Sequence, residues 1–146
     1  ISLSLELNNS GNLVKKTKNG VDGYYTWWDI KYNQGPYITD PKRTSRPVDA
    51  SGKHIKYKGY DYYEIYTPEQ LQALKKVLSG WLSKHNIPYK YDYYDLWPKE
   101  SDVKAKNTKA FKKVPGIYTH NSTRNSGKWD VYPQKELIEM LKSIQT

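Results

Sequence analysis

Residues 66–74 read Tyr-Thr-Pro-Glu-Gln-Leu-Gln-Ala-Leu and carry the strongest signal for local structure in the chain. Thr67 can cap the free amide groups of a first helical turn, Pro68 needs no amide donor there, and Gln70 completes a capping box. Apolar residues then recur at helical spacing, and the Asn-Ile-Pro sequence at 86–88 ends the pattern. The stretch predicts an amphipathic helix that packs one face against a core.

The segment before this helix begins with a regular pattern and continues with an irregular one. Residues 1–7, Ile-Ser-Leu-Ser-Leu-Glu-Leu, alternate apolar and polar side chains, which predicts a strand. The Asn-Asn-Ser-Gly-Asn sequence at 8–12 predicts a turn. Gly and Pro interrupt residues 13–66, so we expect a long excursion that forms walls of a binding groove. Its candidates for regular structure are a strand at 24–28 and a strand pair within 55–65.

The segment after the helix is less periodic until the last residues. Residues 99–113 are rich in lysine and lack periodicity, which predicts a loop. The Ile-Tyr-Thr-His sequence at 117–120 predicts a short buried strand. A final helix is expected from about Pro133, and its buried residues are Leu137, Ile138, Leu141 and Ile144.

The length predicts one domain over residues 1–146. Together with the family resemblance described below, we expect an α/β fold in which a central mixed β-sheet is flanked by helices. Lys and Arg outnumber Asp and Glu by 24 to 15, and the net charge of +9 favours anionic partners. The chain has no cysteine, so a metal site must use His and carboxylate ligands. No apolar run is long enough to cross a bilayer, so we expect no transmembrane segment. The fifteen Tyr residues suggest either half-buried sheet positions or exposed stacking surfaces.

One pair of residues near the carboxyl end is suited to metal binding. His120 ends the expected strand, and Asp130 follows it ten residues later, after a polar loop. A catalytic zinc ion needs about three protein ligands and an open position for water, and these two side chains can supply two of them. The spacing is weak evidence by itself, because a hydrogen-bonded surface His would satisfy it equally well. His85 is interpreted as a cation at a helix carboxyl terminus rather than as a ligand.

Three blocks of the sequence occur together, in the same order, in one known family. Lys128 and Asp130 follow His120 by eight and ten residues, residues 2–7 read Ser-Leu-Ser-Leu-Glu-Leu, and residues 66–74 match Tyr-Thr-x-x-Gln-x-x-Ala-Leu. In these blocks the chain resembles the type-2 N-acetylmuramoyl-L-alanine amidases, which share a fold with peptidoglycan recognition proteins. The resemblance implies an amidase-like α/β fold and hydrolysis of the amide between N-acetylmuramic acid and L-alanine in bacterial peptidoglycan.

The resemblance also implies a role for each matched residue. His120 and Asp130 would bind Zn²⁺, which lowers the pKa of coordinated water to about 7. Glu6, on the polar face of its expected strand, would act as the general base towards that water. Lys128 would stabilise the oxyanion that forms during attack, a contribution of about 3 to 4 kcal/mol for one such donor.

The sequence departs from the family pattern at several points. The family's third zinc ligand is a His on a strand that precedes the Glu6 strand, so we expect the chain to be a domain that lacks its amino-terminal portion. His54 is an alternative source of the third ligand. Trp129 stands where the family has a small or polar residue, and Val-Tyr-Pro at 131–133 replaces a Pro-Gly turn.

Two other functions stay open at this point. The first is a non-catalytic module that binds peptidoglycan, as some recognition relatives do. The second is nucleic-acid binding, suggested by lysines interleaved with Tyr and Trp, but the chain has no recognisable nucleic-acid motif and we expect no such partner. We expect a monomer that is secreted, periplasmic or delivered by a phage to the cell wall, where peptidoglycan is its partner.

Overall fold

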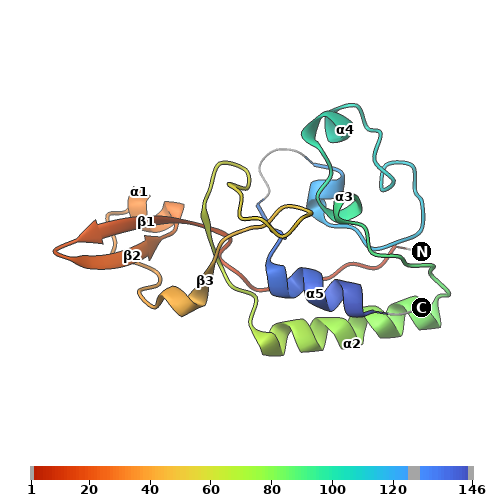
Figure 1. The fold of residues 1–146 in the computed structure, drawn as a ribbon, viewed down its shortest axis with the longest axis horizontal. Coiled ribbons are helices and arrows are strands. Elements are labelled where there is room, and N and C mark those ends of the chain that lie inside the picture. Colours follow the sequence, from red (N-terminus) through yellow and green to blue (C-terminus); the bar gives the residue numbers. More distant parts are fainter. Residues whose placement is uncertain (1, 125–128, 145–146) are drawn as a thin grey trace.

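The computed structural model describes residues 2–124 and 129–144 and shows a mixed α/β fold (Figure 1). Its four strands form one antiparallel sheet in the order β2-β1-β4-β3. The strands are β1 (Asn12–Lys18), β2 (Val21–Tyr25), β3 (Thr44–Ser45) and β4 (Tyr62–Glu64). Because all pairs in the described residues are antiparallel, the expectation of a mixed sheet was wrong, although the α/β class is confirmed.

Helices and short 3-10 turns make up the rest of the regular structure in the described residues. The helices are α1 (Trp27–Lys31), α2 (Pro68–Lys84), α3 (Tyr93–Leu96), α4 (Glu100–Lys104) and α5 (Lys135–Ser143), with short 3-10 turns η1 (Pro41–Arg43) and η2 (His120–Ser122). Both long helices predicted from the sequence are confirmed, and Thr67 and Gln70 form the expected capping box of α2. His85 is the C-cap residue of α2, as its interpretation required.

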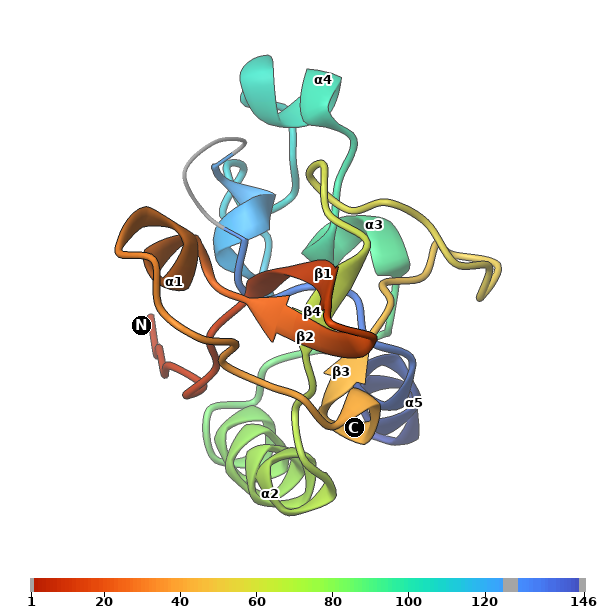
Figure 2. The same cartoon turned by 90° about the vertical axis from the view of Figure 1, so that its left-hand side faces the viewer.

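The main core includes the interface between α2 and α5, which pack against each other and lie below the sheet in the view of Figure 2. At its centre the ring of Tyr132 stacks between Tyr63 and Tyr66, with centroid distances of 4.5 and 5.3 Å. The side chain of Gln134 pairs with the backbone of Tyr66 as a strand would, accepting from its amide at 2.7 Å and donating to its carbonyl at 3.2 Å. Burial raises the pKa of Tyr132 and Tyr66 well above the usual value, so both hydroxyls stay protonated.

A second, smaller unit projects away from this core. We call residues 12–38 the hairpin lobe, because they contain the β1–β2 hairpin, α1 and the loop that follows it; the lobe extends to the left in Figure 1. Its own core consists of Leu13, Tyr24 and Ile38. The segment 13–66, expected to be an irregular excursion, therefore contains most of the sheet. The lysine-rich β1 pairs with β2 although the two strands do not both alternate apolar and polar residues, so the sequence pattern did not indicate this pair.

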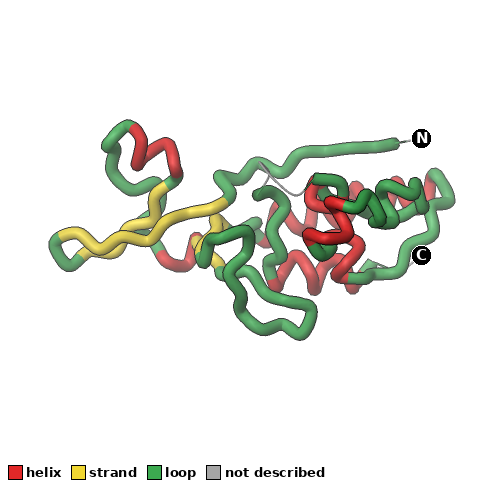
Figure 3. The backbone as a smooth tube through the Cα atoms, turned by 90° about the horizontal axis from the view of Figure 1, so that it is seen from above, coloured by secondary structure: helices red, strands yellow, loops and turns green. Residues whose placement is uncertain are grey.

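The predicted amino-terminal strand is absent, since residues 2–10 run as an extended segment without strand pairing (Figure 3). Alternation of apolar and polar residues favours extended backbone, but a strand also needs a neighbouring backbone to pair with. Here the Asn9 side chain donates to the carbonyls of Glu64 and Ile65, both at 3.0 Å, at the end of β4. Leu3 and Leu5 are consequently exposed, and the predicted turn at 8–12 leads into β1 instead of ending a strand.

Three other local predictions can be compared with the structure. The predicted loop at 99–113 contains the short helix α4. Val103 is the buried residue of α4, and one apolar residue is too few to produce a helical periodicity in the sequence. The predicted strand at 117–120 was wrong, because His120 begins the 3-10 turn η2 under a Thr119 cap. The strand pair expected near Gly59 is confirmed only in part, because an isolated bridge joins Tyr57 and Tyr60 there and β4 pairs with β1 and β3 instead. No helix within 2–124 or 129–144 is long and apolar enough to span a membrane.

Candidate functional site

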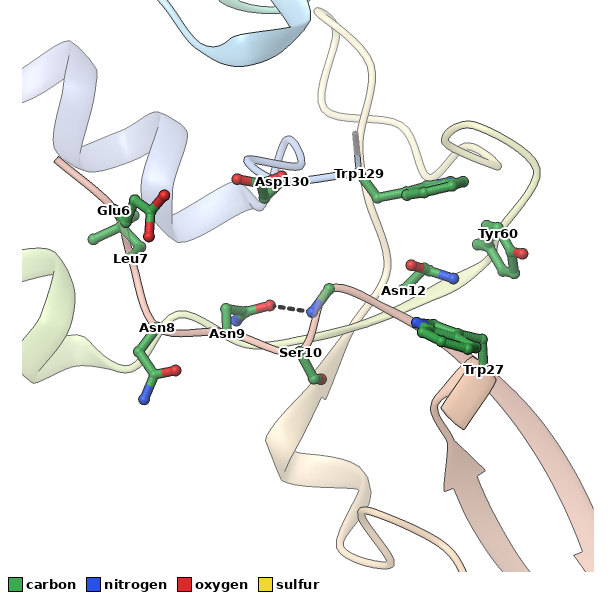
Figure 4. A pocket seen from close by; sticks show the side chains of 11 residues that line it. Glu6, Leu7, Asn8, Asn9, Ser10, Asn12, Trp27, Tyr60, Trp129 and Asp130 are labelled. Atoms are coloured by element: carbon green, nitrogen blue, oxygen red, sulfur yellow. Dashed lines mark hydrogen bonds between the residues drawn. The ribbon is translucent and has the colours of Figure 1, made fainter. Parts of the chain in front are cut away.

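A pocket of about 640 Å³ lies between the amino-terminal segment, the hairpin lobe and the segment that enters α5. It is lined by residues 6–12 and by Trp27, Tyr60, Trp129 and Asp130. Figure 4 shows its two ends, with the carboxylates of Glu6 and Asp130 at one and the aromatic rings at the other. The pocket therefore combines an acidic end suited to metal and proton chemistry with an aromatic end suited to a flat apolar face.

His120 lies beside Asp130, although only Asp130 of the two lines the pocket. The Nδ1 atom of His120 lies 3.5 Å from Oδ2 of Asp130, and the two side chains are 52% and 45% exposed. Asn121 holds the two segments close, because its Nδ2 donates to the carbonyls of Asp130 at 3.2 Å and Val131 at 3.0 Å. The polar loop between the two candidate ligands is thus closed by a buried amide side chain, a contact that spacing did not reveal.

Two further hydrogen bonds fix the segment that carries His120. The hydroxyl of Thr119 donates to the carbonyl of Leu96 at 2.6 Å, and the hydroxyl of Ser122 donates to the carbonyl of Asp95 at 2.7 Å. Ser122 is fully buried, so η2 is anchored to the end of α3 on both sides of His120. The imidazole is therefore presented from a well-supported turn, while its ring stays accessible.

The separation of the two side chains fits a shared zinc ion. Donor atoms that are each about 2.0 to 2.2 Å from a tetrahedral zinc ion lie about 3.4 Å from one another, close to the observed 3.5 Å. A charge-assisted hydrogen bond would be shorter, at about 2.7 to 2.9 Å. No three His, Cys, Asp or Glu side chains in the described part of the chain are grouped closely enough to hold a metal ion. The donor types and spacing fit zinc, with two of the usual three protein ligands.

Glu6 reaches the same pocket from a distant part of the sequence. Gln70, at the start of α2, donates from Nε2 to the carbonyl of Asn8 at 2.9 Å, and the Ser10 amide donates to Oε1 of Glu64 at 2.7 Å. Leu7 packs against the main core. These contacts hold the extended segment beside the pocket, so Glu6 is placed there although its predicted strand does not form.

The remaining predicted residues are placed less directly. Lys128 falls outside the described residues. His54 forms an isolated bridge with Val48, is exposed and does not line the pocket, so nothing in this geometry favours it as a third ligand.

Sequence reasoning missed the aromatic end and one cation near the acidic end. Trp27, Tyr60 and Trp129 were not selected as site residues, although the surplus of Tyr and Trp was a general signal for exposed stacking surfaces. Burial lowers the pKa of Lys58, and the negative charge of Asp130 opposes that shift. The ammonium group of Lys58 therefore lies within the electrostatic reach of the candidate metal ligand.

Comparison with known proteins adds no further constraint on the site. The chain matches no protein-family model, and searches of curated proteins and of solved structures find no significant match.

Proposed function

We propose that this domain is a zinc-dependent amidase that hydrolyses the bond between the lactyl group of N-acetylmuramic acid and L-alanine in peptidoglycan. The observation that carries the proposal is the 3.5 Å approach of His120 Nδ1 to Oδ2 of Asp130, which lines the same pocket as Glu6. Glu6 lies more than a hundred positions before His120 and Asp130 in the sequence, and each of the three has the chemistry that the resemblance to type-2 amidases requires. The amidase-like fold is part of the same proposal.

The chemistry divides between the metal and the protein side chains. A bound zinc ion would lower the pKa of water to about 7 and polarise the amide carbonyl. Glu6 would accept a proton as the water oxygen forms a bond to the lactyl carbonyl carbon, and would return it to the alanine nitrogen as the C–N bond breaks. The products are a lactyl carboxylate on the sugar and a free amino group on the peptide.

The aromatic end of the pocket supports a sugar substrate. Trp129 directly precedes Asp130, and its ring meets that of Tyr60 edge to face at a centroid distance of 6.4 Å. Trp27 lines the same end from the hairpin lobe. A pyranose ring presents C–H groups on its face, which contact the electron-rich face of an aromatic ring favourably. A muramic acid ring held there would place its lactyl amide towards the carboxylate end.

Metal binding by ligand variants tests the proposal. We expect His120→Ala and Asp130→Ala to weaken Zn²⁺ and Co²⁺ binding by at least tenfold, because each removes one of the described ligands. His54→Ala is the matched control, since it removes an exposed imidazole outside the pocket and should leave metal affinity unchanged. The measurements are zinc content after dialysis and the visible spectrum of the Co²⁺ form. Unchanged metal binding in Asp130→Ala would refute the ligand assignment.

Hydrolysis separates the enzyme from its main alternative, a non-catalytic peptidoglycan-binding module. That alternative is favoured by the presence of only two grouped ligands in the described residues. Release of new amino groups from purified peptidoglycan should be measured for the chain with any sequence that precedes Ile1 in its gene. We expect Glu6→Gln to keep the metal and lose about 10²- to 10⁴-fold in turnover. Metal binding and wall binding without amino-group release would establish the binding module instead.

A further inference from the structure

The hairpin lobe carries a cluster of exposed aromatic side chains that the pocket does not account for. We call Trp27, Trp28, Lys31 and Tyr32 the α1 platform. Its three rings are 58%, 48% and 48% exposed. They nevertheless contact one another, with centroid distances of 5.2 Å from Trp27 to Trp28 and 4.3 Å from Trp28 to Tyr32. A contiguous exposed aromatic cluster of this kind is typical of a binding surface rather than of a surface evolved only for solubility.

A single cation lies among these rings. The Nζ atom of Lys31 is 5.7 Å from the ring centroid of Trp27 and 5.4 Å from that of Tyr32. The carboxylate of α1 points elsewhere, because Asp29 is buried and accepts from the Thr26 amide at 2.8 Å in a capping box. The platform therefore presents aromatic faces with one positive charge and no exposed acid of its own helix.

The lobe holds α1 in place before any ligand binds. Tyr24 and Ile38 exchange backbone hydrogen bonds of 2.8 and 3.1 Å, which ties the loop after α1 to β2. Gly23 allows this loop to approach, since a Cβ atom at that position would lie 2.7 Å from Cβ of Pro36. Preorganisation of this kind reduces the entropic cost of binding a ligand on the platform.

The platform is continuous with the pocket. Trp27 belongs to both, because it lines the aromatic end of the pocket and contacts Trp28 on the platform. A chain-like ligand whose one unit lies beside Glu6 and Asp130 could thus extend over Trp27 onto Trp28 and Tyr32. A small ligand would need no such extension.

We propose that the α1 platform binds the part of a peptidoglycan glycan strand from which the peptides have already been removed. This inference rests on the proposed amidase function. Each hydrolysed amide leaves a free lactyl carboxylate on the glycan, so the product strand carries both pyranose faces for the rings and negative charges for Lys31. Charge complementarity with the chain's net charge of +9 favours the same ligand. Binding of product strand would keep the domain on a glycan between successive cuts.

Calorimetric titration of the 146-residue chain with three ligands tests the proposal. The ligands are glycan strands stripped of peptide, chitin oligomers of similar length, and single-stranded DNA. Chitin oligomers have comparable rings without lactyl carboxylates, whereas DNA supplies negative charge without pyranose faces. We expect stripped glycan to bind most tightly. DNA binding as tight as that of stripped glycan would overturn the assignment in favour of a nucleic-acid surface.

Two platform variants and one matched control locate the binding site. Trp28→Ala should weaken binding of stripped glycan about tenfold, because it removes one stacking ring, and Trp28 is not itself among the residues that line the pocket. Lys31→Gln should remove most of the preference for stripped glycan over chitin. Tyr94→Ala is the control, since Tyr94 is also exposed and beside a lysine, Lys99, but lies on α3. Full affinity in Trp28→Ala, or equal loss in Tyr94→Ala, would refute the platform.

The result is separable from the test of amidase function. Stripped glycan contains no amide for the domain to cleave, so its binding does not depend on metal or on Glu6. Binding that survives Asp130→Ala but falls in Trp28→Ala would support the platform even if no hydrolysis were found. Hydrolysis together with unaltered glycan binding in Trp28→Ala would support the amidase and reject the platform.

Discussion

The hairpin lobe and the body of the molecule use aromatic residues in opposite ways. In the body, residues 44–124 and 129–144, the rings of Tyr63, Tyr66 and Tyr132 are stacked and fully buried. In the lobe, the rings of α1 contact one another but remain about half exposed, over a small core of three residues. Similar residue types thus stabilise one region and provide a surface in the other. The difference shows that the body buries its rings in a core, while the lobe leaves its rings exposed on the surface for which we propose glycan binding.

Truncation of the central tyrosine of the body should have the largest effect on stability. Tyr132→Ala removes a ring that stacks on two others and a hydroxyl that donates to the Glu64 carbonyl at 2.8 Å. We expect the free energy of unfolding to fall by about 3 to 5 kcal/mol, as for other large-to-small core substitutions. Urea denaturation followed by far-UV circular dichroism measures it. A loss below about 1 kcal/mol would show that the body does not depend on this stack.

Crowding between the lobe's hairpin and its following loop should have an intermediate effect. Gly23→Ala would place a methyl group 2.7 Å from Pro36 Cβ, so the loop must shift, at a cost of about 1 to 3 kcal/mol. The matched control is Gly35→Ala, because a Cβ atom there meets no other atom within 4 Å. Thermal unfolding of both variants measures the difference. Equal stability of the two variants would mean that the packing of the loop on β2 contributes little.

Removal of a platform ring should have the smallest effect on stability. Trp28→Ala should change the free energy of unfolding by less than about 0.5 kcal/mol, because the ring is about half exposed and outside both core clusters. The same urea titration used for Tyr132→Ala measures it. A loss comparable to that of Gly23→Ala would assign Trp28 a structural role and weaken the contrast between the two regions.

The sequence predicted the proximity of two candidate site residues only where they lie close together along the chain. His120 and Asp130 are ten residues apart in the sequence, and the structure places their side chains 3.5 Å from each other. Glu6 lines the pocket although its predicted strand is absent, since its segment is held by Asn9 and Gln70 rather than by strand pairing. The aromatic end could not be assembled from the sequence, because it depends on contacts between residues far apart along the chain.

The sequence by itself determined the two long helices and their faces. The capping box at Thr67, the apolar spacing of α2 and the pattern of α5 act through neighbours three or four residues apart, so they are legible without any tertiary information. Tertiary structure alone decided which extended segments became strands. Residues 2–10 have the clearer alternation but no partner backbone among the described residues, whereas β1 pairs with β2 and β4. Strand formation depends on a second segment whose position only the complete fold specifies.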